Sequence, residues 1–202
     1  AAEIFDRDVP DAIVNTLDFT SPEAADDLEA MRAHVHAYED YQALQKALTE
    51  NGWIAFIADG SILARRSGVS QLPMEDAVAF KSPESLRSDV TLPHAGHIHG
   101  MAIEPGVTVI VGGGYHGKST LLNALQRGVY AHIPGDGREL VATVEDAVKV
   151  RAADGRAVTG VDVSPLITAL PGGADTARFT TENASGSTSQ AASIMEAIEL
   201  GT

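Results

Sequence analysis

The 202-residue sequence lacks cysteine, long hydrophobic runs and any surplus of basic residues. Without cysteine there is no disulfide framework and no thiolate metal site, which fits a reducing cytoplasm. The most apolar stretches, Trp53–Ala58 and Val107–Val111, are far shorter than the roughly 20 residues of a membrane-spanning helix. We therefore expect a cytoplasmic protein with no membrane partner.

Basic residues are scarce, because 14 Lys and Arg stand against 28 Asp and Glu and leave a formal net charge of −14. A surface of this charge repels nucleic acid and anionic lipid at long range. A phosphate-bearing ligand must therefore be held by a local arrangement of donors. Hydrophobic residues make up 44% of the chain, which is enough to build one or two folded domains.

A long amphipathic helix is predicted in the first quarter of the chain. Ser21 and Pro22 are typical of an N-cap and a first helical position, and Asn51-Gly52 is typical of a left-handed stop. Apolar residues recur between them at steps of three and four, at Leu28, Met31, Val35, Tyr38, Tyr41, Leu44 and Leu48. We expect residues 1–51 to be the end of an N-terminal helical region and residues 52–202 to form a separate domain.

Strand patterns follow this helix. We predict a hairpin of Trp53–Ala58 and Ser61–Ala64 around Asp59-Gly60, followed by a mostly irregular stretch over Arg65–Asp89. A further strand at Ile98–Ile103 is expected to turn at Glu104-Pro105-Gly106. Its predicted antiparallel neighbour, Val107–Val111, is short and β-branched, as in strands that are buried on both faces.

The last third of the chain predicts a second hairpin and a final helix. Val148–Ala152 and Ala157–Val163 flank the turn pair Asp154-Gly155 and are expected to pair with each other. Leu170–Phe179 has the composition of a loop. A helix is predicted from Ser185-Gly186 to about Leu200.

The strongest motif lies between the run Val107–Val111 and a predicted helix. Gly112, four further residues and then Gly117-Lys118-Ser119 fit the phosphate-binding loop, in which glycine-rich backbone aims N–H groups at phosphates. We expect Lys118 to bridge the β- and γ-phosphates, Ser119 to place its hydroxyl on Mg²⁺, and Thr120 to contact the α-phosphate. The predicted nucleotide-binding residues are Gly112, Gly113, Gly114, Tyr115, His116, Gly117, Lys118, Ser119 and Thr120.

Other polar residues carry weaker expectations. Asp136 and Glu139 fall in a glycine-rich turn that we expect to be solvated, although they could also approach a metal or nucleotide. Asp162 is expected to be an acid at a strand end, the alternative being a metal contact. Arg65-Arg66 is an isolated basic pair, expected at the surface or near a phosphate.

Three histidines also lie close together in the sequence, at positions 94, 97 and 99. His97 and His99 would share one face of a strand. Zinc needs ligands that converge, and no cysteine supports these histidines, so we expect no metal site from them.

Longer segments carry a resemblance to a known family. The run from Met101 to Leu122 resembles the opening of an ABC-type ATPase domain, and Ala184–Gln190 is similar to the signature motif of that superfamily, with Ser187 and Thr188 where glycine and glutamine are usual. From about residue 52 onward the chain resembles the bacterial family known as predicted ATPases of the ABC class. The segments that carry this resemblance are Phe56–Leu63, Arg65–Val69, Phe80–Ser85, Gly112–Thr120, Ile133–Glu139 and Ala184–Ala192.

The resemblance implies an α/β P-loop fold with an antiparallel lead-in and a preceding long helix. It also implies a soluble ATPase that uses Mg²⁺ and ATP in a head-to-tail homodimer. ATP would lie between the phosphate loop of one subunit and the signature-like residues of the other, which are Ser185, Gly186, Ser187, Thr188 and Gln190. Relatives linked to RNA leave nucleic acid open as a partner, although the acidic charge opposes tight binding.

In this superfamily the acidic pair that supports hydrolysis, and a histidine that senses the γ-phosphate, follow the signature helix. No apolar strand ending in Asp-Glu follows Ser185, so the catalytic residues stay unassigned. We therefore expect the chain to be part of a longer ATPase. On its own it should bind nucleotide weakly and hydrolyse little ATP. A non-hydrolysing nucleotide-binding or assembly module is one alternative. A second alternative is another P-loop class, a GTPase or a kinase. A GTPase needs an Asn-Lys-x-Asp motif, which does not occur in the sequence. A kinase needs an arginine-rich lid, and the loop after Leu170 holds only Arg178.

Overall fold

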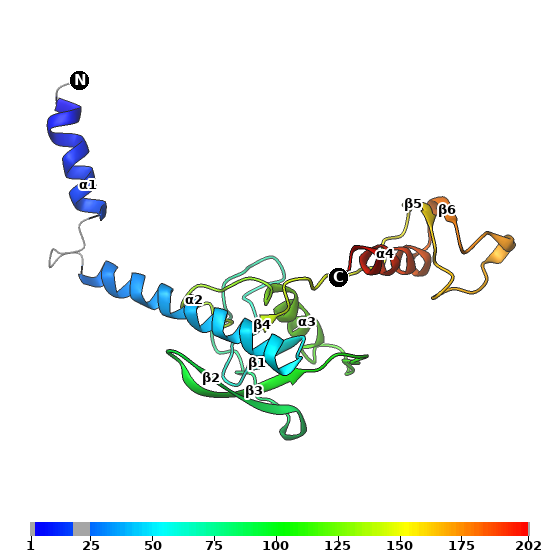
Figure 1. Ribbon diagram of the computed structural model, residues 1–202, viewed down its shortest axis with the longest axis horizontal. Coiled ribbons are helices and arrows are strands. Elements are labelled where there is room, and N and C mark those ends of the chain that lie inside the picture. Colours follow the sequence, from blue (N-terminus) through cyan, green and yellow to red (C-terminus); the bar gives the residue numbers. More distant parts are fainter. Residues whose placement is uncertain (1–2, 18–24, 202) are drawn as a thin grey trace. The chain divides into compact units, whose positions relative to one another are not determined.

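A computed structural model describes residues 3–17 and 25–201, which form two compact units, 1–144 and 145–202 (Figure 1). The first unit starts with a π-helical turn, η1 (Ile4–Asp8), and the helix α1 (Val9–Leu17). The predicted helix start at Ser21-Pro22 lies outside the described residues. The boundary predicted between residues 51 and 52 stays a prediction.

The long helix α2 (Ala25–Asn51) ends as predicted, with Gly52 at a φ of +67°. Only its second half is packed: Leu44 and Leu48 are fully buried, whereas Val35 and Tyr38 are more than half exposed. The apolar residues of α2 therefore continue into its first half, where the rest of the first unit does not cover them.

A four-stranded antiparallel sheet forms the centre of the first unit. Its strands are β1 (Ala55–Ala58), β2 (Arg87–Leu92), β3 (Gly96–Ile103) and β4 (Val141–Thr143), arranged in the order β2-β3-β1-β4. Successive side chains of a strand point to opposite faces. On β1, Phe56 packs with α2, and Ile57 packs with the helix α3 (Lys118–Arg127). The sheet therefore lies between α2 and α3 (Figure 1).

The hairpin predicted at residues 53–64 is wrong. β1 pairs with β3, where Phe56 lies opposite Ala102, and with β4, where Phe56 lies opposite Ala142. Both hydrogen-bonding edges of β1 are therefore occupied by segments that lie far away in the sequence. The stretch predicted to be mostly irregular also contains β2, preceded by a 3₁₀ turn, η3 (Glu84–Leu86).

The strand predicted at Val107–Val111 is wrong for the described chain. β3 is confirmed, but it pairs with β1 on one side and β2 on the other, so both of its edges are taken before the chain turns at Glu104. Residues 107–111 have no strand assignment, and Val107 is 96% exposed. They line an open groove of about 780 Å³ together with the end of β3 and Leu121 of α3.

The second unit is a hairpin covered by one helix. β5 (Arg156–Val161) pairs antiparallel with β6 (Phe179–Ala184), and not with residues 148–152 as predicted. A 3₁₀ turn, η4 (Pro171–Gly173), lies in the connection that was expected to be a loop. Helix α4 (Gly186–Leu200), predicted correctly, buries Ala191 and Ala192 against Val158 and Phe179.

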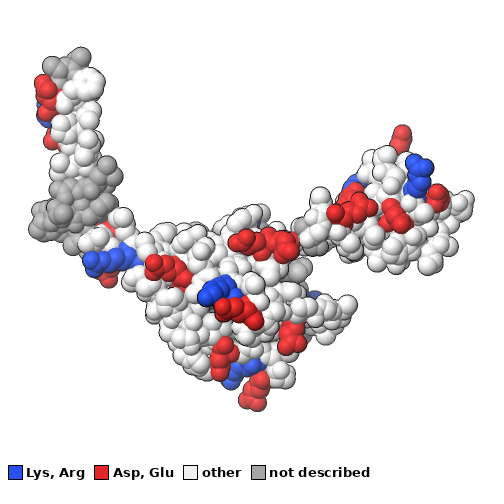
Figure 2. All heavy atoms as spheres, in the orientation of Figure 1, with Lys and Arg blue, Asp and Glu red and all other residues white. Residues whose placement is uncertain are grey.

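Acidic side chains outnumber basic ones on the face drawn in Figure 2, in agreement with the formal charge of −14. Among residues 3–17 and 25–201, no helix is long and apolar enough to cross a bilayer.

Candidate nucleotide-binding site

Helix α3 is attached firmly to the sheet, and it carries the phosphate-loop motif at its N-terminus. Ala124 is fully buried against Ile57 and Val141. At the other end of the helix, the Thr143 hydroxyl donates to the Leu125 carbonyl at 2.8 Å. Gly128 permits this contact, because a Cβ there would lie 2.9 Å from the Thr143 Oγ1 atom. The C-terminal half of α3 is therefore held against the sheet, and the motif lies at the opposite end of the helix.

The loop before α3 contains a backbone conformation that favours glycine. Gly117 is the N-cap at a φ of +77°, in the left-handed region that residues with a Cβ rarely adopt. No side chain caps this helix start. Tyr115 also has a positive φ, of 61°, and its side chain is fully exposed. The first turn of α3 is thus free of any side-chain cap, and such uncapped N-terminal amides are suited to an anion.

Two side chains of the motif fold back onto the loop itself. The Lys118 ammonium donates to the Gly112 carbonyl at 2.6 Å and also to the Gly113 carbonyl. The Gly113 N–H donates to the His116 Nδ1 atom at 3.3 Å, so the imidazole lies against the loop backbone. The Lys118 ammonium and the Gly113 N–H are therefore both occupied by partners within the loop.

The two hydroxyl residues of the motif lie in the first turn of α3. Ser119 is exposed, and Thr120 is partly buried. A hydroxyl next to a bound phosphate is a ligand that Mg²⁺ accepts, because this ion usually keeps water and phosphate oxygens as its other ligands. The residues present at the loop therefore suit a magnesium-bound phosphate.

The signature-like residues lie in the second unit, at the start of α4. Ser185 is the N-cap, and its side chain accepts from the Thr188 N–H at 3.5 Å. Ser185, Ser187 and Gln190 are exposed. Thr188 is only 7% exposed, and its hydroxyl donates to the Ser185 carbonyl at 3.1 Å. The surface of this helix start therefore offers the hydroxyls of Ser185 and Ser187, but not that of Thr188.

Helix α4 is fixed to the loop before β5 by a buried serine. The Ser189 Oγ atom accepts from the Ala153 N–H at 2.9 Å and donates to the Gly186 carbonyl at 2.9 Å. Gly186 lies close to Asp154, since a Cβ would lie 3.0 Å from its carboxylate. The helix start is thus held in place within its own unit.

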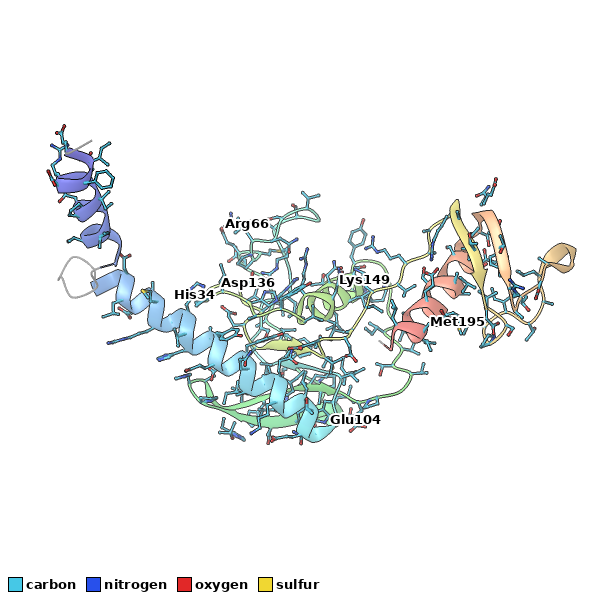
Figure 3. The ribbon with its side chains drawn as sticks, turned by 45° about the horizontal axis from the view of Figure 1, so that its top comes forward. His34, Arg66, Glu104, Asp136, Lys149 and Met195 are labelled. Atoms are coloured by element: carbon cyan, nitrogen blue, oxygen red, sulfur yellow. The ribbon has the colours of Figure 1, made fainter. Side chains whose placement is uncertain are left out.

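The turn that contains Asp136 is not solvated as predicted. Its side chain is 16% exposed and pairs with Arg65 at 2.8 Å and with His132 at 2.8 Å. Arg65 itself is only 8% exposed, so its predicted surface position is also wrong. In Figure 3, Asp136 lies among side chains within the first unit, whereas Arg66 projects at its edge beside Glu75.

A second buried arginine completes this cluster. Arg138 donates to the Leu63 carbonyl and is 3% exposed. Burial lowers the pKa of Arg138 to about 10, and the neighbouring Arg65 cation adds to this effect. Arg138 therefore remains a cation at neutral pH. The cluster of Arg65, Arg138, His132 and Asp136 ties the segment after β1 to the turn before β4.

The two remaining acids make local contacts. The Glu139 carboxylate accepts from the Gly135 N–H at 2.6 Å. Asp162 follows the last residue of β5, as predicted for an acid at a strand end, and accepts from the Ser164 N–H at 2.9 Å. Hydrogen bonds from the Ser164 side chain and backbone hold the pKa of Asp162 below its usual value.

The three histidines separate into two groups. His94 contacts Glu39 at 2.5 Å and stacks on His36, both from α2. His97 and His99 share one face of β3, as predicted, and Asp89 of β2 lies between them. The hydrogen bond with His99 is the main cause that lowers the pKa of Asp89. Asp89 was not predicted, because its strand was not recognised in the sequence.

Comparison with protein families identifies the chain. The profile of the ABC_ATPase P-loop domain matches residues 27–202, which include the first unit from residue 27 onward and the whole second unit. The chain therefore belongs to the ABC_ATPase P-loop family. It has an α/β fold with an antiparallel sheet and a preceding long helix, and its family is one of nucleotide-binding ATPases.

A curated relative comes from the archaeon Methanocaldococcus jannaschii. The chain is similar to the uncharacterized protein MJ1628, with 30% identity over 138 residues, which is 64% of this chain. The matched region is 31% of the relative, so the chain spans about a third of the length of that protein.

Proposed function

We propose that this chain is the phosphate-binding part of an ABC-class ATPase and holds MgATP at Gly112–Thr120. The observation that carries the proposal is the start of α3. Its N-cap is the left-handed Gly117, directly before Lys118, and no side chain caps the helix. Exposed amides at a helix start and one ammonium group supply the local positive field that an acidic protein needs to hold a triphosphate.

The side chains of the loop suit the successive phosphates. Lys118 would exchange its contacts with the Gly112 and Gly113 carbonyls for the β- and γ-phosphates. His116 would leave the Gly113 N–H, which then faces the phosphate. The exposed Ser119 hydroxyl would hold Mg²⁺, which supplies positive charge to the phosphate oxygens when bound. Thr120 would contact the α-phosphate.

We further propose that the complete protein is a cytoplasmic homodimer that hydrolyses ATP. In a head-to-tail pair, the exposed Ser185 and Ser187 hydroxyls and the backbone of Gly186 would face the γ-phosphate bound by the other subunit, with Gln190 one turn further along the helix. Thr188 would act from below the surface, by orienting Ser185. The energy would drive conformational work on a macromolecule, and the acidic charge favours a target other than nucleic acid.

Replacement of Lys118 tests the loop assignment. We expect Lys118→Ala to weaken binding of a fluorescent ATP analogue, with Mg²⁺ present, by about 100-fold, since an ammonium group that contacts two phosphates is lost. The matched control is Lys46→Ala, because Lys46 is exposed on α2 and pairs with Glu50 at 3.4 Å. Unchanged affinity in Lys118→Ala, or equal losses in the two variants, would contradict the proposal.

The dimer is tested separately in the complete protein. Light scattering is expected to show a monomer that becomes a dimer when MgATP is added to a variant that binds but does not hydrolyse it. Ser185→Ala should raise the ATP concentration needed for this change. If nucleotide binds tightly and the mass does not change, the non-hydrolysing binding module becomes the better description.

A further inference from the structure

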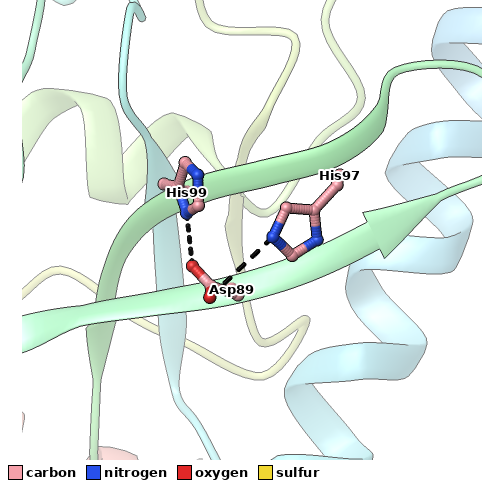
Figure 4. A group of neighbouring side chains, drawn as sticks. All are labelled: Asp89, His97 and His99. Carbon is pink, nitrogen blue, oxygen red and sulfur yellow. Dashed lines mark hydrogen bonds and ion pairs between the residues drawn. The ribbon is translucent and has the colours of Figure 1, made fainter.

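Near its turn, the β2–β3 hairpin presents two histidines and an aspartate on an exposed part of one face of the sheet (Figure 4). We call Asp89, His97 and His99 the hairpin cluster. Asp89 of β2 lies directly opposite His99 in the antiparallel register, and His97 is two residues away on β3, on the same face. Alternate residues of β2, Val90 and Leu92, are buried in the core, which fixes the register of this face.

The potential ligand atoms of the hairpin cluster converge. The His99 Nδ1 atom lies 2.5 Å from the Asp89 Oδ1 atom, and the His97 Nε2 atom lies 3.9 Å from the Asp89 Oδ2 atom. One ligand atom from each residue lies within 4.8 Å of the other two. Within the parts of the chain that the structure describes, no other three His, Asp or Glu side chains meet this criterion.

The neighbouring residues orient this group without blocking it. The Thr91 hydroxyl is 3.4 Å from the His97 Nδ1 atom, which leaves the Nε2 atom of that ring directed toward Asp89. A hydrogen bond to the remote ring nitrogen is the usual way in which a metal-ligating histidine is oriented. Arg87, the next residue on this face of β2, is bonded to Ser82 at 3.0 Å and does not occupy the space between the histidines.

We propose that the hairpin cluster binds a divalent transition-metal ion of the zinc type through His97, His99 and Asp89. Two imidazoles and one carboxylate form a ligand set that Zn²⁺ and Co²⁺ accept, and no cysteine is needed. The three side chains are each more than half exposed, so the remaining coordination position would face solvent and could take water or an exchangeable ligand. The acidic charge of the chain favours the approach of a cation.

Metal binding requires only small side-chain movements. In a tetrahedral site with bonds of about 2.0–2.1 Å, neighbouring ligand atoms are about 3.3 Å apart. The contact between His99 and Asp89 would therefore open from 2.5 Å, and the one between His97 and Asp89 would shorten from 3.9 Å. Because the sheet backbone is fixed by the buried face, rotations about side-chain bonds are sufficient for this change.

Titration of the untagged full chain with Co²⁺, in buffer without nucleotide, tests this proposal. We expect one equivalent to bind and to give the visible absorption of a low-coordinate cobalt site, which Zn²⁺ then abolishes by competition. His97→Ala and His99→Ala should each weaken Co²⁺ binding tenfold or more. Asp89→Asn, which keeps the shape of the side chain, should weaken it and change the absorption spectrum.

Two controls make the outcome specific. His34→Ala removes another exposed histidine, from α2 and outside the hairpin cluster, and should leave cobalt binding unchanged. Lys118→Ala should also leave it unchanged, so failure of the nucleotide proposal is distinguishable from failure of this one. The proposal is overturned if folded wild-type protein binds no Co²⁺ at millimolar concentration, or if the folded double variant His97→Ala, His99→Ala binds it as tightly as the wild type does.

Discussion

Helices α3 and α4 begin in opposite ways. The N-cap of α3 is a left-handed glycine, Gly117, and no side chain accepts from its first amides. The N-cap of α4 is Ser185, whose side chain accepts from the Thr188 N–H. Every helix start has N–H groups without partners inside the helix, and these groups need an acceptor from elsewhere. In α4 the chain supplies one such acceptor itself, whereas α3 leaves its first turn available to a ligand.

The two helix starts also differ in how they are supported. α3 is fixed at its far end by Thr143 and Gly128, and the loop before its first residue is exposed. α4 is fixed at its first turn by Ser189, which is fully buried. The first arrangement permits the loop to change shape around a ligand. The second arrangement presents a surface of fixed form.

Among the variants that test this comparison of the two helix starts, the largest effect is expected at the N-cap of α3. Gly117→Ala places a Cβ in the left-handed region, which costs about 1–2 kcal/mol. The free loop can relax to avoid this strain, but the bound loop cannot, so we expect ATP affinity to fall about tenfold. Nucleotide titration by calorimetry measures this loss.

The matched control for this change is Gly114→Ala in the same loop. A Cβ at either glycine would meet nothing within 4 Å, but only Gly117 of the two has a φ between +20° and +160°. Any difference between the variants therefore reports backbone conformation and not crowding. Equal losses in the two variants would mean that the left-handed cap has no special part in binding.

Features set by neighbouring residues could be predicted from the sequence, and this explains why both helix starts were found. The glycine spacing before Lys118 and the Ser185-Gly186 pair specify local turns and caps, and both helices begin where the sequence indicates. The same holds for Gly52 at the end of α2. These elements need no knowledge of distant contacts.

Features set by distant partners were missed. The runs Ile98–Ile103 and Val107–Val111 have similar strand propensity, yet only the first is paired, because strand formation depends on a free edge of a neighbour. Asp136 was expected in solvent, because its partner Arg65 lies 71 residues away. Asp89 is a candidate metal ligand because the pairing of β2 with β3 places it opposite His99, and the sequence does not show this pairing.

A smaller effect is expected at the start of α4. Ser185→Ala removes the N-cap acceptor and should lower the free energy of unfolding of the second unit by about 1 kcal/mol, whereas Ser185→Gly should cost only about a few tenths. Ser187→Ala is the control, since its exposed hydroxyl lies 3.2 Å from the Ser185 Oγ atom but is not the group that accepts from the Thr188 N–H. Hydrogen exchange of the α4 amides measures the change. If Ser185→Ala loosens α4 no more than Ser187→Ala does, the contrast between a self-capped and an open helix start fails.

The smallest effect is expected at Asp162, which also satisfies a backbone amide within its own unit. Its pKa is lowered in the folded state by hydrogen bonds from Ser164, so the stabilisation is present above the pKa of the unfolded chain and is lost as pH falls through the folded pKa. An NMR titration should therefore show the Ser164 amide signal moving below pH 4, with a midpoint under the ordinary aspartate value of about 3.9. Asp162→Asn keeps an oxygen acceptor and should retain the turn while abolishing this titration, whereas Asp162→Ala should lose both. If the signal titrates equally in Asp162→Asn, another carboxylate is responsible. Asp162 would then not be an acceptor that the second unit supplies for its own amides, as Ser185 is at the start of α4.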